Sequence, residues 1–215
     1  MPGAVVLRSQ SSARVKKLHR FTEPTPTSMA SGESVEIFVS SWEIECCAPP
    51  PVVGHPSSWA LIFFTDASED NREFHRDSCW RVVDNGSAPV LVNGTITAMW
   101  PSFNGPAPAP GPARLRGYLS GTAHGGLIPP DFPTITGVVQ RIRLAAQRFV
   151  LGETRVGRAL QPAPGTLTLT DVPRSPRWFA SPRPQTEDHP DNPPSQIGVL
   201  LDLTIARHRR RGSGG

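Results

Sequence analysis

Lysine, cysteine and long apolar runs are scarce in this sequence, and each shortage excludes a class of function. Lys16 and Lys17 are the only lysines, so the rest of the chain offers none for a Schiff base or a phosphate-binding loop. Three cysteines among 215 residues are too few for a disulfide-rich secreted scaffold. No stretch approaches the roughly 18 consecutive apolar residues of a membrane-spanning helix. We therefore expect a soluble protein.

The N-terminal sequence favours the cytoplasm. The apolar residues Ala4 to Leu7 precede the basic residues, which reverses the order of a secretory signal peptide. The low cysteine content is typical of proteins in a reducing compartment. We therefore predict a cytoplasmic protein with no membrane partner.

The signatures of several enzyme classes are missing from the sequence. There is no His-Glu-x-x-His, no dinucleotide-binding glycine fingerprint and no calcium-loop pattern. His124-Gly125-Gly126 resembles the oxyanion loop of some esterases, but the partner motif Gly-x-Ser-x-Gly is absent and a turn explains the glycines. Glu43 and Glu45 would share one face of a strand, where solvation alone accounts for a pair of acids. The balance is against an enzyme.

Proline and glycine are abundant, at 25 and 19 residues, which disfavours long helices. Apolar residues make up 37% of the chain and charged residues 19%, which suits one modest folded domain. We predict a disordered basic leader over 1–33, a single β-rich domain over 34–206 and a disordered basic tail over 207–215. Proline-rich insertions are expected near 101–113 and 173–195.

The net charge of +4 belongs to the two ends of the chain. Residues 1–32 and 207–215 each carry +4, whereas residues 33–206 hold 13 basic and 17 acidic side chains. Because an acidic body repels phosphate, nucleic acid would bind only through the tails and without sequence selection. The candidate contacts are Lys16, Lys17, Arg20, Arg209, Arg210 and Arg211.

Short apolar or alternating runs bounded by turn residues predict about seven strands. They span 35–46, 58–64, 90–100, 114–119, 134–144, 166–170 and 197–205. Asn93-Gly94 suits either a hairpin turn or a glycine bulge. Residues 66–78 are polar and acidic, which fits a short helix or a loop. The pattern predicts a mainly β fold, a small antiparallel barrel or sandwich with proline-rich loops and disordered termini.

The first run changes phase part-way along its length. The alternating apolar residues of 35–39 share one face of a strand, whereas those of 42–46 have the opposite phase. One extra residue near Ser40-Ser41 would return both sets to one side, so we predict a β-bulge there. Aromatic residues within the predicted strands, among them Trp42, are expected to pack in the core.

Cys46, Cys47, His75 and Cys79 are candidate zinc ligands, because zinc prefers thiolate and imidazole. His75 and Cys79 would lie on one face if residues 70–80 were helical. Adjacent strand residues face opposite ways, so only one of Cys46 and Cys47 could ligate without a backbone distortion. The alternative interpretation is that these cysteines are buried core thiols. No cofactor is predicted, and zinc is kept as an alternative.

A first strand is followed by Trp42-Glu43-x-x-Cys46-Cys47, and Val53-Gly54 then leads into a strand with Trp59-x-Leu61. This succession resembles the opening of small actinobacterial proteins grouped as domain of unknown function 6578. Residues 136–142 and 198–203 resemble the central and closing strands of that family. The resemblance implies a compact β-rich protein of an actinobacterium and supplies no activity.

Two positions depart from the pattern of the family. Ala48 stands where the family has glycine after the cysteine pair, and His55 stands where an acidic residue is expected. The leader and the proline-rich insertions also lie outside the pattern. The resemblance therefore supports the fold more than a function.

The leading hypothesis is a cytoplasmic, non-enzymatic binding or interaction module. Its partner, a protein or a small ligand, would bind near the start of the Cys46-Cys47 loop. This interpretation leads because a binding module needs no catalytic constellation. Zinc binding by Cys46 or Cys47 with His75 and Cys79 is the first alternative, and non-specific nucleic-acid binding through the tails is the second.

Overall fold

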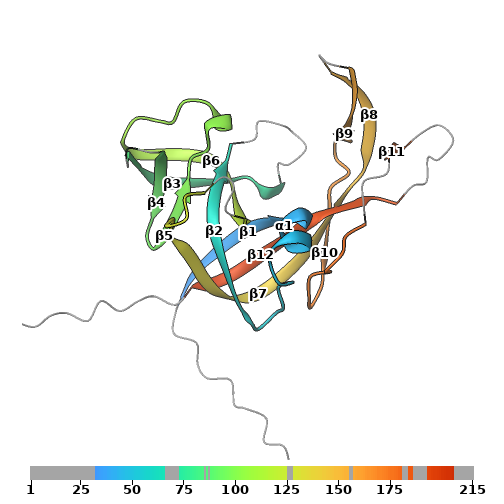
Figure 1. Ribbon diagram of the computed structural model, residues 1–215, viewed down its shortest axis with the longest axis horizontal. Helices are drawn as coiled ribbons and strands as arrows, with labels where there is room; N and C mark the ends of the chain where they lie inside the picture. The colour runs from blue at the N-terminus through green and yellow to red at the C-terminus, as the bar shows by residue number, and fades with distance from the viewer. Residues whose placement is uncertain are drawn as a thin grey trace, which may run out of the picture.

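Strands form most of the part of the chain that the structure, a computed structural model, describes (Figure 1). The described residues are 32–65, 73–84, 86, 88–124, 128–154, 157–180, 184–185 and 193–205. The elements are β1 (Glu33–Ser40), α1 (Ser41–Cys46), β2 (Pro56–Phe64), β3 (Arg76–Asp84), β4 (Pro89–Asn93), β5 (Ile96–Met99), the 3₁₀ turn η2 (Ser102–Asn104), β6 (Gly111–Thr122), β7 (Thr134–Gln147), β8 (Phe149–Thr154), β9 (Gly157–Pro162), β10 (Thr168–Asp171), β11 (Pro184–Gln185) and β12 (Ser195–Ile205). The predicted mainly β class is confirmed.

Eight of these strands, β1 to β7 and β12, close into a barrel. The sheet runs in the order β10-β7-β12-β1-β6-β2-β5-β4-β3, and it closes because β7 also pairs with β2 and β3 also pairs with β6. Most neighbours are antiparallel, although β1 meets β6 in parallel at Phe38 and Ser120. Of the barrel and the sandwich that the sequence allowed, the barrel is the fold, with a strand count close to the predicted seven.

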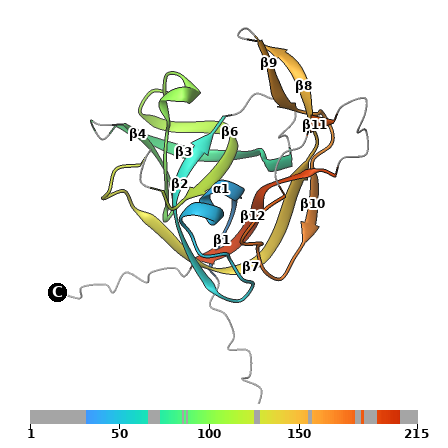
Figure 2. The ribbon, with the colours of Figure 1, turned by 45° about the vertical axis from the view of Figure 1, so that its right-hand side comes forward.

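β6 is the strand from which β1 and β3 diverge. Its residues 118–122 pair with β2, while residues 111–117 pair with β3. β1 touches β6 at Ser120, and no pairing joins β1 to β3 among the described strands. In Figure 2, β3 and β4 lie above β1, β12 and β7. The gap in pairing between β1 and β3 leaves space for side chains from both.

The hydrophobic core fills the inside of the barrel. Alternate residues of β1 and β12 point inward, namely Val35, Ile37, Val39, Val199, Leu201 and Leu203. Three tryptophans are also buried, and each indole N–H donates to a nearby oxygen: Trp59 to Ser57 Oγ, Trp80 to Ser78 Oγ and Trp100 to the Gly105 carbonyl. These bonds matter because an unpaired buried N–H is costly.

The bulge predicted near Ser40-Ser41 is wrong, because β1 ends at Ser40 and α1 begins at Ser41. Residues four apart share one face of a helix, so Trp42 and Cys46 point outward while Glu43 and Ile44 are buried. Trp42 is 51% exposed, which contradicts its predicted core position. The phase change in the sequence marks a switch from the period of a strand to the period of a helix.

The sequence patterns do not predict β3, β8 or β9. β3 begins within a segment expected as a helix or loop, because its first residues, Arg76 and Asp77, are polar and exposed. β8 and β9 pair into a hairpin that projects from the barrel (Figure 1). Within the described residues, no helix combines the length and apolar character needed to span a bilayer.

The predicted proline-rich insertions contain some regular structure. The segment 101–113 holds η2 and the first residues of β6, and 173–195 holds β11 and the first residue of β12. Arg174 also forms an isolated antiparallel bridge with Val52. Nearly all of the expected leader, 1–33, and all of the tail, 207–215, lie outside the described residues.

Candidate functional site

The structure does not bring the four predicted zinc ligands together. Cys46 and Cys47 lie at the end of α1, where a disulfide joins them. His75 stacks on Tyr118 with 5.8 Å between ring centroids, and the exposed Cys79 lies on β3 opposite Arg114 of β6. The physical reason is that residues 76–84 form a strand in the barrel wall, not a helix beside the cysteine pair.

A histidine that the zinc hypothesis omits lies against the disulfide. His124, just after β6, places Nδ1 3.4 Å from Cys47 Sγ. Its ring also meets the Trp42 ring nearly edge-on, with 4.8 Å between centroids. We call Trp42, Cys46, Cys47 and His124 the disulfide site. No local signal joins these residues, because Cys47 and His124 are 77 positions apart in the chain.

Glu43 fixes the backbone that carries His124. Its buried carboxylate accepts hydrogen bonds from the Thr122 hydroxyl at 2.5 Å and from the N–H groups of Ala123 and His124 at 2.9 and 3.2 Å. Three donors satisfy a charge that would be costly to bury alone. Glu45 accepts instead from the Phe179 N–H at 2.7 Å, so the two acids serve separate contacts.

Arg177 holds the C-terminal end of α1, which is the end that carries the disulfide. Its guanidinium donates to the Ile44 carbonyl at 2.7 Å and to the Ala48 carbonyl at 2.8 Å, near the C-terminus of the helix. A helix of six residues is too short to be stable alone. Tertiary contacts from residues 122–124 and 177–179 therefore set the position of the disulfide site.

The chemistry of the disulfide site depends on its oxidation state. The sulfur atoms of Cys46 and Cys47 and a ring nitrogen of His124 all lie within 4.8 Å of one another, which is close enough for one metal ion. A metal requires thiolates, however, and disulfide sulfurs are not thiolates. In the oxidised state, the site is an exposed disulfide beside an imidazole, and reduction would turn it into two thiols and an imidazole.

A cavity of about 230 Å³ opens where β1 and β3 diverge from β6, and we call it the β1–β3 cavity. Five aromatic side chains line it, namely Phe38, Phe63, Phe74, Trp80 and Tyr118. Phe38 stacks on Phe74 with 4.9 Å between centroids, and Tyr118 contacts both rings. The sequence gives one indication of this aromatic wall. Phe38 alternates with the inward-facing residues of β1, so its side chain points away from the barrel core.

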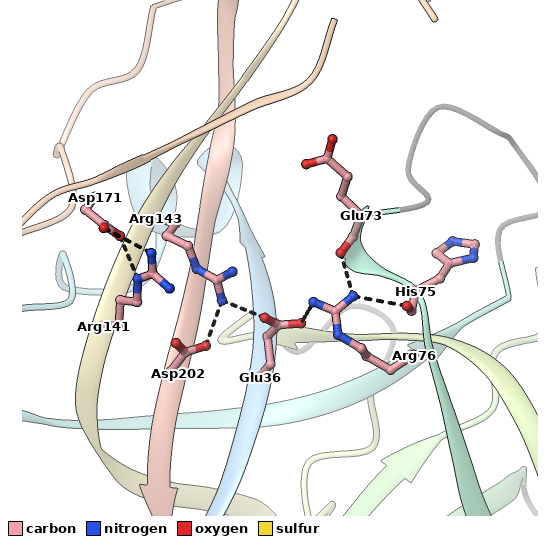
Figure 3. Close-up of polar contacts among 8 residues, drawn as sticks. All are labelled: Glu36, Glu73, His75, Arg76, Arg141, Arg143, Asp171 and Asp202. Carbon is pink, nitrogen blue, oxygen red and sulfur yellow. Dashed lines mark hydrogen bonds and ion pairs between the residues drawn. The ribbon is translucent and has the colours of Figure 1, made fainter. Parts of the chain in front are cut away.

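Charged side chains also line the β1–β3 cavity. Figure 3 shows Glu36 of β1 between two arginines: Arg76 of β3 at 2.8 Å and Arg143 of β7 at 2.6 Å. Arg143 also binds Asp202 of β12 at 2.8 Å. Glu36 and Arg76 belong to the lining, so this chain of ion pairs connects the cavity to the neighbouring barrel wall.

A separate ion pair joins β10 to β7. Arg141 donates to both carboxylate oxygens of Asp171, at 2.7 and 3.0 Å, and both side chains are exposed (Figure 3). The hydrogen bond from Arg141 holds the pKa of the Asp171 carboxyl below its ordinary value, and the same bond raises the pKa of Arg141.

The candidate nucleic-acid contacts all lie outside the described residues. These are Lys16, Lys17 and Arg20 in the leader and Arg209, Arg210 and Arg211 in the tail. Binding through them stays a prediction from charge alone.

The family model that matches this chain covers residues 33–205, from the first residue of β1 to the last residue of β12. The chain belongs to the family of unknown function DUF6578. No curated protein and no solved structure is significantly similar to it. Membership of DUF6578 brings no activity, but the match includes both the disulfide site and the β1–β3 cavity.

Proposed function

We propose that this protein is a binding module that holds a small ring-containing molecule with a hydrogen-bond donor in the β1–β3 cavity. The observation that carries the proposal is the carboxylate of Glu36 in the wall of an aromatic-lined cavity. The proposal keeps the binding function that the sequence favours and moves the ligand away from the Cys46-Cys47 loop.

The apolar part of the cavity favours a small, flat ligand. The rings of Phe38 and Phe74 stack on each other, and Tyr118 meets both nearly edge-on. Aromatic side chains also pack well against the ring of a ligand. The volume of about 230 Å³ is below the range of about 300 to 1,000 Å³ that is usual for drug-sized ligands. A single ring with a short substituent therefore fits better than a large cofactor.

The polar part of the cavity favours a donor or a cation. Nη1 of Arg76 already donates to the carbonyl oxygens of Glu73 and His75, at 2.6 and 3.1 Å, and Nη2 binds Glu36. An anion would have to break these contacts. The Glu36 oxygens each accept one arginine N–H and keep lone pairs for another donor. Glu33 adds a second carboxylate, so the lining holds two carboxylates and one guanidinium.

The lining supports binding more than chemistry. Among the described residues that line the cavity there is no histidine and no cysteine. The Ser78 hydroxyl in the lining accepts the Trp80 indole N–H at 2.7 Å. A nucleophile with an adjacent base is not part of this arrangement.

Two probes of equal ring size and opposite charge test the proposal. We expect 2-phenylethylamine to bind in isothermal titration calorimetry, and phenylacetate to bind roughly tenfold more weakly because it meets Glu33 and Glu36. Equal affinity for the two probes, or no binding of the amine, would overturn the proposed ligand class.

A variant that fills the cavity provides the structural control. Ser34 is exposed and lines the cavity, so Ser34→Trp should abolish amine binding while the fold is kept. Ser102→Trp places the same side chain on exposed η2, outside the lining, and should bind like the parent protein. Retained binding in Ser34→Trp would show that the amine binds elsewhere.

Zinc binding by the reduced disulfide site is a second candidate, because its three ligand atoms lie within 4.8 Å of one another. After reduction with a phosphine, about one zinc per chain should remain after dialysis, measured by mass spectrometry. Cys47→Ser and His124→Ala should lose it, and His75→Ala and Cys79→Ser should keep it. Zinc that depends on His75 and Cys79 would contradict this site.

A further inference from the structure

The two sulfur atoms of the disulfide site have different surroundings. Cys46 and Cys47 are both exposed, so a thiol in solution can reach the bond between them. The 3.4 Å contact of His124 Nδ1 is with Cys47 Sγ. When Nδ1 carries a proton, that N–H points a donor at one of the two sulfurs. The two halves of the disulfide are therefore chemically unequal.

The contacts around His124 keep the imidazole in place. Its backbone N–H donates to the buried Glu43 carboxylate, and its ring packs against Trp42. Cys47 is equally fixed, because its N–H donates to the Glu43 carbonyl at 3.0 Å and Arg177 holds the carbonyl of Ala48. Glu43 thus fixes both partners of the contact, through its side chain and through its backbone.

We propose that the Cys46–Cys47 disulfide oxidises dithiols, with Cys46 as the attacked sulfur and Cys47 as the leaving sulfur. Attack on a disulfide is faster when the leaving thiolate is stabilised, and a proton donor beside Cys47 does this for Cys47. This activity belongs to the disulfide site and goes beyond ligand binding in the β1–β3 cavity.

The reaction balances with a dithiol as the reductant. One substrate thiolate forms a bond to Cys46 Sγ, and the bond between Cys46 and Cys47 breaks with its electron pair on Cys47 Sγ. His124 Nδ1–H gives its proton to that sulfur, and solvent restores the proton on the imidazole. The second substrate thiolate then attacks the substrate sulfur of the mixed disulfide and releases Cys46, which takes a proton from solvent. Two electrons and two protons pass from the dithiol to the cysteine pair, and the substrate leaves as a disulfide.

The test uses Cys79→Ser as the parent, because Cys79 is a free, exposed thiol. Dithiothreitol is the dithiol probe; samples are quenched with acid at intervals and desalted to remove it, and the two new thiols on the protein are then counted with a thiol reagent. We expect His124→Ala in this parent to react roughly tenfold more slowly, because the leaving sulfur loses its proton donor. His55→Ala is the matched control, since His55 is also exposed and lies outside the ligand group of the disulfide site; its rate should not change.

A second measurement tests which of the two sulfurs is attacked, without altering His124. Glutathione, a monothiol, should be trapped on the oxidised parent protein as a mixed disulfide at Cys46, located by peptide mass spectrometry. Glutathione at Cys47, or an unchanged rate in His124→Ala, would overturn the proposal. So would a thiol count showing that the pair stays reduced in air. These outcomes leave the β1–β3 cavity untouched, so they can be separated from a failure of ligand binding.

Discussion

Glu36 and Asp202 lie opposite one another in the register of β1 and β12, and both carboxylates accept a hydrogen bond from Nη2 of Arg143. Like charges at facing positions of neighbouring strands repel each other. Only 13% of the Arg143 side chain is exposed, so water screens its attraction to the two acids weakly. Arg143 on β7 therefore holds β1 and β12 together beside the β1–β3 cavity.

Arg143→Met should destabilise the protein. It removes the cation and leaves Glu36 and Asp202 facing each other while keeping most of the side-chain volume. We expect a loss of roughly 2 kcal/mol in the free energy of unfolding, below the full cost of breaking a buried pair because both acids are partly exposed. Urea unfolding measures it. Arg141→Met, which breaks an exposed pair, should cost less, and equal losses would contradict the bridging role.

The pKa of Asp171 should lie below its ordinary value of 3.8, because Arg141 donates a hydrogen bond to the charged carboxylate. A carboxyl with a depressed pKa in the folded state stabilises the fold above its unfolded pKa. That contribution is lost as the pH falls through the folded pKa. A carbon-13 NMR titration of the Asp171 carboxyl gives the value. Arg141→Gln should raise it towards 3.8, and a midpoint unaffected by Arg141→Gln would contradict the assignment.

Glu43→Gln should loosen the segment that carries His124. The glutamine keeps the shape but loses the charge, and its NH₂ group must either face the two backbone N–H groups or turn the Thr122 hydroxyl from donor into acceptor, so the charge-assisted hydrogen bonds are lost. We expect a cost of about 1 to 3 kcal/mol in thermal unfolding. Faster hydrogen exchange is also expected at the amides of Ala123 and His124. Glu45→Gln, where the acid accepts one hydrogen bond, is the matched control. Unchanged exchange at both amides would contradict the anchoring role.

The strands that the sequence predicts well are those in which one face is more buried than the other. β1 alternates through Val35, Ile37 and Val39, and β10 alternates with threonines, so a period of two is visible in both. β3 is hidden because its polar first residues look like the preceding loop. α1 is hidden because six residues are too few to establish a helical period, and contacts from Arg177 and residues 122–124 decide its conformation.

The candidate sites are less predictable because they depend on register and closure. The sequence singles out Cys46 and Cys47, yet their partner His124 lies just after β6, 77 positions along the chain from Cys47. The β1–β3 cavity exists because β6 changes partners along its length. Glu36 and Arg76 meet only through that topology, since their strands are not paired. Neither relation has a local signature in the chain.

The central claim, that the β1–β3 cavity binds a small ring compound that carries a hydrogen-bond donor, is tested most directly by mapping the site of a bound probe. Uniformly nitrogen-15-labelled protein would be titrated with 2-phenylethylamine, and backbone amide shifts recorded. We predict that the largest shifts fall on residues 34–38 of β1, 76–80 of β3 and 117–119 of β6, which line the cavity. Shifts concentrated at 42–48 and 122–124 around the disulfide site, or no saturable shifts, would contradict the claim.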